Sequence, residues 1–185
     1  MSQLKYVLDI EAHFPVAQDA DSLKQHIESL VNNDIKDSVL KQLQGHIWEQ
    51  GYKNGDIKAP VYPDAVEFIK RHAPNVYIYS SGSVKAQILL FEHVEGDIDL
   101  TKFITGYFDI NTSGKKTEAQ SYANILQSIG LGQSSADSVV FISDNEKELD
   151  AASDVGIKTF LALRPGNNPV SCVEKYTAVT DFSSI

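Results

Sequence analysis

The stretch Val139-Val140-Phe141-Ile142-Ser143-Asp144-Asn145 decides the fold, because four consecutive apolar residues end abruptly in polar ones. A short apolar run bounded by polar residues is typical of a strand buried on both faces of a parallel sheet. The sequence predicts such a strand over 139–142, a helix over 146–155 and a further strand over 158–163. Asp144 would then lie at the carboxyl end of the first of these strands.

The same alternation of strands and helices extends toward the N-terminus. Earlier strands are predicted at 4–8, 76–79 and 108–110, and helices at 64–72, 83–92 and 117–129. Ser83 is a suitable N-cap for the second of these helices. Because parallel strands need a crossover, usually a helix, this order predicts an α/β fold: a Rossmann-like parallel sheet with helices on both faces.

Residues 21–52 follow a different pattern, with apolar residues spaced as on the face of a helix. The Asn32-Asn33-Asp34 cluster predicts a turn that divides this region into two helices. Residues 54–63 contain an Asn-Gly pair and two prolines, which is typical of a linker. We therefore expect a helical insertion between the first predicted strand and the rest of the sheet.

The composition is that of a globular protein. The chain has 185 residues, of which 42% are hydrophobic and 22% charged. With 16 basic and 25 acidic residues its net charge is −9, so we do not expect it to bind nucleic acid. The single cysteine, Cys172, excludes an internal disulfide, and no apolar run is long enough to span a membrane. We expect a cytosolic monomer, small enough at 20.4 kDa to enter the nucleus as well.

Acidic residues follow two of the predicted strands. Asp9 and Glu11 follow the strand at 4–8, and Asp144 follows the strand at 139–142. Because ligands collect at the carboxyl ends of parallel strands, these carboxylates suit Mg²⁺, which prefers hard oxygen ligands. Two alternatives remain open. Asp9 and Glu11 are solvated loop residues, or Asp144 is the N-cap of the helix at 146–155.

Two other predicted strands are followed by residues suited to an anion. Ser80-Ser81-Gly82-Ser83 places small hydroxyl residues and a glycine before a helix N-terminus, where negative charge is favoured. Lys116 lies in a polar loop before the helix at 117–129, and a lysine there can neutralise a phosphate. The alternatives are that the serines only cap a helix, and that Lys115 and Lys116 are exposed loop residues.

In chain order, these residues form the layout of a phosphoryl-transfer site. The carboxylate of Asp9 would attack phosphorus, Ser80 and Lys116 would hold the phosphate, and Asp144 would complete a Mg²⁺ site. A small phosphorylated molecule is therefore the expected substrate, and the net negative charge does not exclude it, because a phosphate needs only one or two local cations.

Longer motifs make the chain resemble the haloacid-dehalogenase superfamily and, within it, the enolase-phosphatases of methionine salvage in the form found in yeasts. The stretches that carry the resemblance are Ile57-Lys58-Ala59-Pro60-Val61-Tyr62, residues 76–87 (VYIYSSGSVKAQ), residues 107–122 (YFDINTSGKKTEAQSY) and Arg164-Pro165-Gly166-Asn167. The resemblance implies a core formed by residues 1–11 and 60–185, with a shortened helical cap and linker at 12–59.

The resemblance also implies roles for individual residues. Asp9 would be the nucleophile and a Mg²⁺ ligand, and Glu11 would contribute to the same one-ion site and act as a second catalytic residue in proton transfer. Ser80 and Ser81 would bind the substrate phosphate, Lys116 would contact the substrate, and Asp144 would bind Mg²⁺. Such enzymes enolise 2,3-diketo-5-methylthiopentyl 1-phosphate and then remove its phosphate, which gives the acireductone 1,2-dihydroxy-3-keto-5-methylthiopentene.

The chain departs from the family directly after Glu11, where it reads Ala12-His13-Phe14-Pro15 and soon enters the helical region. The family continues there with Gly-Thr, a flap over the site and further cap helices. The abrupt change indicates an internal deletion. Because an uncovered site leaves the substrate in water, an alternative is a non-catalytic protein that binds a phosphorylated ligand or a partner. The shortened cap could also expose apolar helix faces and promote self-association.

Overall fold

The computed structural model describes residues 20–33, 38–183 and 185. The predicted strand at 4–8 lies outside these residues, and so do Asp9 and Glu11. The chain divides into two compact units, Met1–Ile57 and Lys58–Ile185. The predicted boundary between residues 59 and 60 lies close to this division. The prediction that residues 1–11 belong to the core falls outside the described residues.

Within its described residues, the first unit contains two helices, α2 (Ala20–Asn32) and α3 (Ser38–Lys53). The predicted turn begins where α2 ends, and the Asn33 side chain donates a 2.7 Å hydrogen bond to the Ser29 carbonyl there. Ile47, on the apolar face predicted for the second of these helices, is 55% exposed within the described residues. None of the helices in the described ranges is long and apolar enough to cross a membrane.

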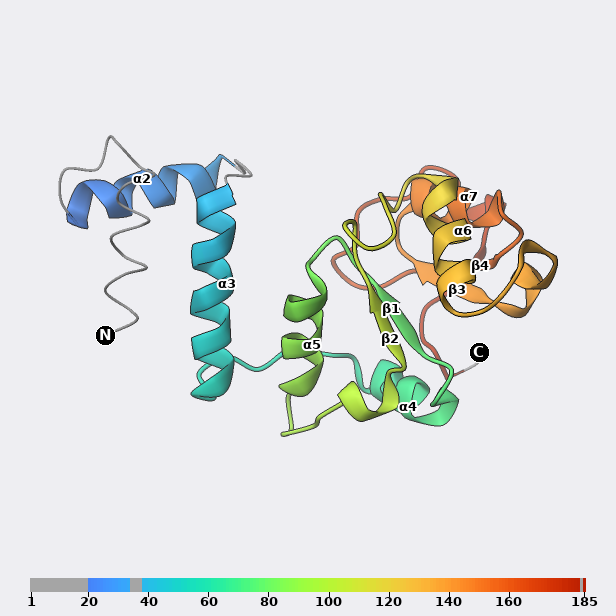
Figure 1. Cartoon of the computed structure of the whole chain (residues 1–185), viewed down its shortest axis with the longest axis horizontal. Helices are drawn as coiled ribbons and strands as arrows, with labels where there is room; N and C mark the ends of the chain where they lie inside the picture. The colour runs from blue at the N-terminus through green and yellow to red at the C-terminus, as the bar shows by residue number, and fades with distance from the viewer. Residues whose placement is uncertain (1–19, 34–37, 184) are drawn as a thin grey trace. The chain divides into compact units, whose positions relative to one another are not determined.

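The second unit alternates helices and strands along the chain (Figure 1). Its elements are α4 (Pro63–His72), β1 (Tyr77–Tyr79), α5 (Val84–Glu92), β2 (Gly106–Phe108), α6 (Ala119–Ser128), β3 (Val140–Ser143), α7 (Glu146–Ser153), β4 (Lys158–Ala162) and β5 (Thr177–Val179), with short 3₁₀ helices at Thr101–Phe103, Gln133–Ser138 and Val173–Lys175.

All strand pairs in this unit are parallel, which confirms the predicted α/β class. β1 pairs with β2, with Tyr77 opposite Gly106, and the order β3-β4-β5 forms a second sheet. Within the described residues the two sheets are separate, so β1 and β3 each have one edge without a neighbouring strand.

Two predicted strands differ from the observed ones. The strand predicted at 108–110 is β2 at Gly106–Phe108, because Asp109 instead starts a turn whose Asn111 and Thr112 N–H groups donate to its carboxylate. The strand predicted as fully buried at 139–142 is β3 at Val140–Ser143, and Val140 is 47% exposed.

The core lies where α6 and α7 pack together next to β3 and β4. Its buried residues are Tyr122, Leu126, Ala136, Ala151, Ala152, Val155 and Ile157. Tyr122 is 1% exposed, and its ring meets Phe141 edge-on at 5.0 Å between centroids. Burial of each large apolar side chain stabilises the fold by roughly 1.5–3 kcal/mol, and this core fixes the strand ends from which the site is built.

Candidate functional site

An ion pair joins the segments that follow β2 and β3, next to the end of β1. Lys116 Nζ lies 2.6 Å from Glu148 Oε2, and Ser143 Oγ, at the end of β3, donates to the same oxygen at 2.8 Å. The Lys116 ammonium also lies 5.8 Å from the ring centroid of Tyr79, which ends β1. Lys116 is therefore not an exposed loop lysine, and the alternative that treated it as one is wrong. The structure holds it between the two strand ends that carry Ser80 and Asp144.

The loop that carries Lys116 is anchored by hydrogen bonds from α6. The Tyr122 hydroxyl donates to the Lys116 carbonyl at 2.7 Å, and Ser121 Oγ donates to the Lys115 carbonyl at 2.7 Å. Tyr79 adds a third such bond, to the Gly114 carbonyl at 2.7 Å. Burial raises the pKa of both tyrosines, so their hydroxyls stay protonated and keep donating at neutral pH.

Gly114 is required by this anchoring. Its φ is +109°, in the region that side-chain-bearing residues avoid, and a Cβ there would lie 2.6 Å from Ser121 Oγ. The close approach of the loop backbone to α6 therefore depends on the missing side chain.

Asp144 does not cap α7. The N-cap is Asn145, whose Oδ1 accepts a hydrogen bond from the Lys147 N–H at 3.0 Å, so the alternative for Asp144 is wrong. Asp144 itself is exposed and has no hydrogen bond or ion pair to the residues that the structure describes. Its carboxylate follows β3 directly and is free to bind a ligand.

The loop Ser80–Ser83 contains the predicted N-cap and an exposed serine. Ser83 caps α5, since its Oγ accepts from the Ala86 N–H at 3.3 Å. Ser80 Oγ accepts from the Gly82 N–H at 3.2 Å, which folds the loop into a tight turn. Ser81 is exposed, and neither its N–H nor its hydroxyl has a hydrogen-bond partner in the described ranges.

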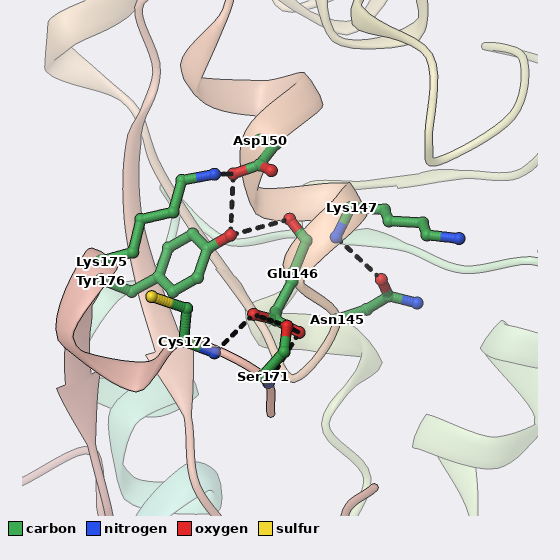
Figure 2. A network of polar contacts seen from close by, with 8 residues as sticks. All are labelled: Asn145, Glu146, Lys147, Asp150, Ser171, Cys172, Lys175 and Tyr176. Carbon is green, nitrogen blue, oxygen red and sulfur yellow. Dashed lines mark hydrogen bonds and ion pairs between the residues drawn. The ribbon is translucent and has the colours of Figure 1, made fainter. Parts of the chain in front are cut away.

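The outer side of α7 is fastened to the segment 171–176 (Figure 2). The Glu146 carboxylate accepts from the N–H groups of Ser171 and Cys172, at 3.0 and 3.1 Å. Asp150 Oδ1 accepts from the Tyr176 hydroxyl at 2.8 Å and pairs with Lys175 Nζ at 2.7 Å. This network holds the start of α7, and therefore the turn with Asp144, against the loop that follows β4.

A hollow of about 1440 Å³ lies between the unpaired edges of β1 and β3. Its lining includes Tyr77–Tyr79 from β1, 140–143 from β3 and Asp144. The walls are mostly apolar, whereas Asp144 contributes a carboxylate at the carboxyl end of the strands.

The described residues do not form a metal site by themselves, since no group of three His, Cys, Asp or Glu side chains converges among them. Two of the three predicted Mg²⁺ ligands, Asp9 and Glu11, lie outside those residues. The third, Asp144, fits the role: it is an exposed hard oxygen donor without a competing protein partner in the described part.

Three residues that support this arrangement were not predicted as site residues: Glu148, which pairs with Lys116, Asp109, whose carboxylate accepts from the Val84 N–H, and Gln87, whose side chain donates to the Gly82 carbonyl. Asp109 directly follows β2, so the rule that singled out Asp144 at the end of β3 would have found it, had the strand been placed correctly. Glu148 lies four residues after Asp144, in the first turn of α7. Gln87 had no signal in the sequence beyond its place in a helix.

Comparisons with known proteins give close relatives, although no family model matches the chain. The chain is 69% identical to enolase-phosphatase E1 of Kluyveromyces lactis, over all of both chains. It is 54% identical to enolase-phosphatase E1 of Zygosaccharomyces rouxii, over 97% of this chain and 81% of that protein. The alignment to the Kluyveromyces lactis protein has 221 positions, 36 more than the 185 residues of this chain, so the relative carries residues that this chain lacks.

Solved structures agree with these relatives. The crystal structure of the UTR4 protein from Saccharomyces cerevisiae superposes with a TM-score of 0.86 at 52% identity, over 96% of this chain and 80% of that one. A dehalogenase with an intermediate complex superposes with a TM-score of 0.57 at 20% identity, over 98% of this chain, and shows the shared fold.

Proposed function

Since the chain belongs to the enolase-phosphatase E1 family, we propose that it is a hydrolase that enolises and then dephosphorylates 2,3-diketo-5-methylthiopentyl 1-phosphate in methionine salvage. The product would be the acireductone 1,2-dihydroxy-3-keto-5-methylthiopentene, released with phosphate. Family membership follows from identity of 69% over the full length of a relative.

The observation that carries this proposal is the position of Lys116. Its ammonium is held by Glu148 at 2.6 Å between the end of β1, where Ser80 and Ser81 follow, and the end of β3, where Asp144 follows. A cation between a hydroxyl-rich loop and a free carboxylate is an arrangement suited to a phosphate with a divalent cation beside it.

Asp9 and Glu11 are proposed to belong to this site. They follow the strand predicted at 4–8, and acidic residues that follow parallel strands collect at the carboxyl edge of a sheet, where Asp144 also lies.

In this site, the Asp9 carboxylate would attack phosphorus, forming a bond to it while the bond between phosphorus and the substrate oxygen breaks. Water would then hydrolyse the aspartyl phosphate and restore Asp9. The hydroxyls of Ser80 and Ser81 would donate to the phosphate oxygens, and Lys116 would orient and neutralise them. Asp9, Glu11 and Asp144 would hold Mg²⁺, which supplies further neutralisation of the transferring group.

The shorter chain defines the alternative. We infer that the 36 positions missing relative to the Kluyveromyces lactis protein include the flap and cap segment expected after Glu11. Without that cover, the same serines and lysine would form a binding site for a phosphorylated ligand that does not turn it over.

The test is Mg²⁺-dependent release of phosphate from the diketo phosphate. We expect turnover that EDTA abolishes and that Asp9→Asn and Asp144→Asn each reduce by about 100-fold or more. Asp154→Asn, an exposed carboxylate at the C-cap of α7, is the matched control and should leave the rate unchanged. Turnover that survives Asp9→Asn would contradict the mechanism. If phosphate stabilised the folded chain but the chain released no phosphate from the substrate, the binding alternative would be established.

A further inference from the structure

Gln87 is a buried polar residue that holds the serine loop to the end of β2. It is 5% exposed, and its Nε2 donates to the Gly82 carbonyl at 2.8 Å and to the Phe108 carbonyl at 2.9 Å. Its Oε1 is buried without a hydrogen-bond partner in the described part of the chain. A buried acceptor without a partner lowers stability, so the presence of glutamine here must rest on the two hydrogen bonds that its amide nitrogen donates.

Asp109 holds the other end of the same loop. It is 4% exposed, and its Oδ2 accepts from the N–H of Val84, the first residue of α5, at 3.0 Å. Its Oδ1 accepts from the N–H groups of Asn111 and Thr112, at 2.9 and 2.8 Å. The carboxylate therefore ties the start of α5 to the turn after β2. Burial alone would raise its pKa, but these donors outweigh burial and lower the pKa.

Together, these bonds decide which donors remain for a ligand. The Val84 N–H is taken by Asp109 and the Ala86 N–H by Ser83, so two N–H groups of the first turn of α5 are used within the protein. The N–H groups of Ser81 and Ser83 and the Ser81 hydroxyl have no partner among the described residues. An anion would therefore bind to these groups of the loop rather than to the N–H groups of Val84 and Ala86 in the first turn of α5.

We propose that Gln87 and Asp109 are positioning residues that hold Ser80–Ser83 in the conformation in which it binds the phosphate of the substrate. They act through the loop and do not touch the phosphate. The inference rests on the proposed function for the identity of the substrate, but the geometry of the loop concerns phosphate binding alone.

Each bond can be removed separately. Asp109→Asn keeps the shape of the side chain but removes its charge, and Gln87→Leu removes both donors at similar size. Val84→Pro removes the N–H that Asp109 accepts from. Proline is favoured at the first position of a helix, and Ser83, at φ −58° and ψ 150°, already has the backbone that precedes proline. This variant therefore tests the same bond from its other side.

The matched control is Asp99→Asn. Asp99 accepts from the N–H and the hydroxyl of Thr101, at 2.9 and 2.5 Å, so it makes the same type of turn as Asp109. It precedes β2, whereas Asp109 follows it. Loss of an ordinary turn should affect both variants alike, but loss of the phosphate loop should affect only Asp109→Asn.

The experiment measures the dissociation constant of inorganic phosphate by calorimetry, and kcat and KM for the diketo phosphate, on the full chain. We expect Asp109→Asn, Val84→Pro and Gln87→Leu each to raise the phosphate Kd and the KM by about tenfold, the effect of one lost hydrogen bond to a charged group, with kcat changed much less. The Asp109→Asn, Val84→Pro double variant should bind phosphate no more weakly than the weaker-binding single variant, because both changes remove the same bond between the Val84 N–H and Asp109.

Several results would overturn the inference: folded variants that bind phosphate like wild type, additive effects of Asp109→Asn and Val84→Pro, an equal effect of Asp99→Asn, or a folded wild-type chain that does not bind phosphate. Absence of turnover, with phosphate binding that still depends on Asp109 and Gln87, would refute the proposed function while supporting this inference.

Discussion

Two glutamates on α7, two residues apart, serve opposite faces of the same helix. Glu148 points inward, is 9% exposed, and accepts from Ser143 Oγ and Lys116 Nζ. Glu146 points outward and accepts from the N–H groups of Ser171 and Cys172 (Figure 2). Both carboxylates are well supplied with donors. They differ in how much water could take the place of those donors if the contacts were lost.

This difference determines how much each contact contributes to stability and function. A donor freed at the surface is hydrated at once, so the net loss is small. A charged group freed in a largely buried site has little water to replace its partner, and the loss approaches the full desolvation cost. We therefore expect the inner face of α7 to determine the geometry of the site, and the outer face to adjust it slightly.

The largest effect is expected for Glu148→Gln. The change keeps the shape of the side chain but leaves Lys116 without its counter-charge, so the free energy of unfolding should fall by about 2–3 kcal/mol. Urea denaturation measures this. The matched control is Glu118→Gln, which breaks the exposed pair of Glu118 with Lys115 at 3.5 Å and should cost less than about 1 kcal/mol. Equal losses in the two variants would break the comparison between buried and exposed contacts.

Much of this site could be predicted from the sequence, because the signals are local. The cap by Ser83, the strand ends before Ser80 and Asp144, and the parallel α/β class all follow from the spacing of apolar residues and the residues that stop them. The roles of Ser80, Ser81, Lys116 and Asp144 remain predictions.

What the sequence could not indicate are choices between neighbours and contacts across long separations. Asp144 and Asn145 are both good N-caps, and only the backbone at this turn decides that Asn145 is used. The bond between Glu146 and Ser171 joins residues 25 apart, in a segment without apolar periodicity. The position of β2 was wrong by two residues, since the alternation of apolar residues does not reveal that Asp109 begins a turn.

A smaller effect is expected for Gly114→Ala, which sharpens the comparison on the inner side. The new Cβ would meet Ser121 Oγ at 2.6 Å and would force a side chain into a φ of +109°, so stability should fall by about 1–3 kcal/mol. Gly166→Ala is the control, because Gly166 has a φ of +88° with nothing within 4 Å of its Cβ position. Denaturation of both variants separates the clash from the backbone strain. If the two variants lose the same free energy of unfolding, the close packing of the Lys116 loop on α6 does not contribute to stability.

The smallest effect is expected for Glu146→Gln, on the outer face. The N–H groups of Ser171 and Cys172 and the hydroxyl of Ser171 lower the pKa of Glu146, so the ionised form stabilises the folded chain. That contribution is fully present above the ordinary pKa of 4.5 and is lost as the pH falls through the lower pKa of the folded state. The melting temperature of the variant should therefore lie slightly below that of wild type at pH 7, and the two should converge as the pH falls below about 4.5. Asp154→Asn, exposed at the C-cap of the same helix, should show no such convergence. If Glu146→Gln lowered the melting temperature as much as Glu148→Gln at pH 7, solvent exposure would not be what separates the two faces of α7.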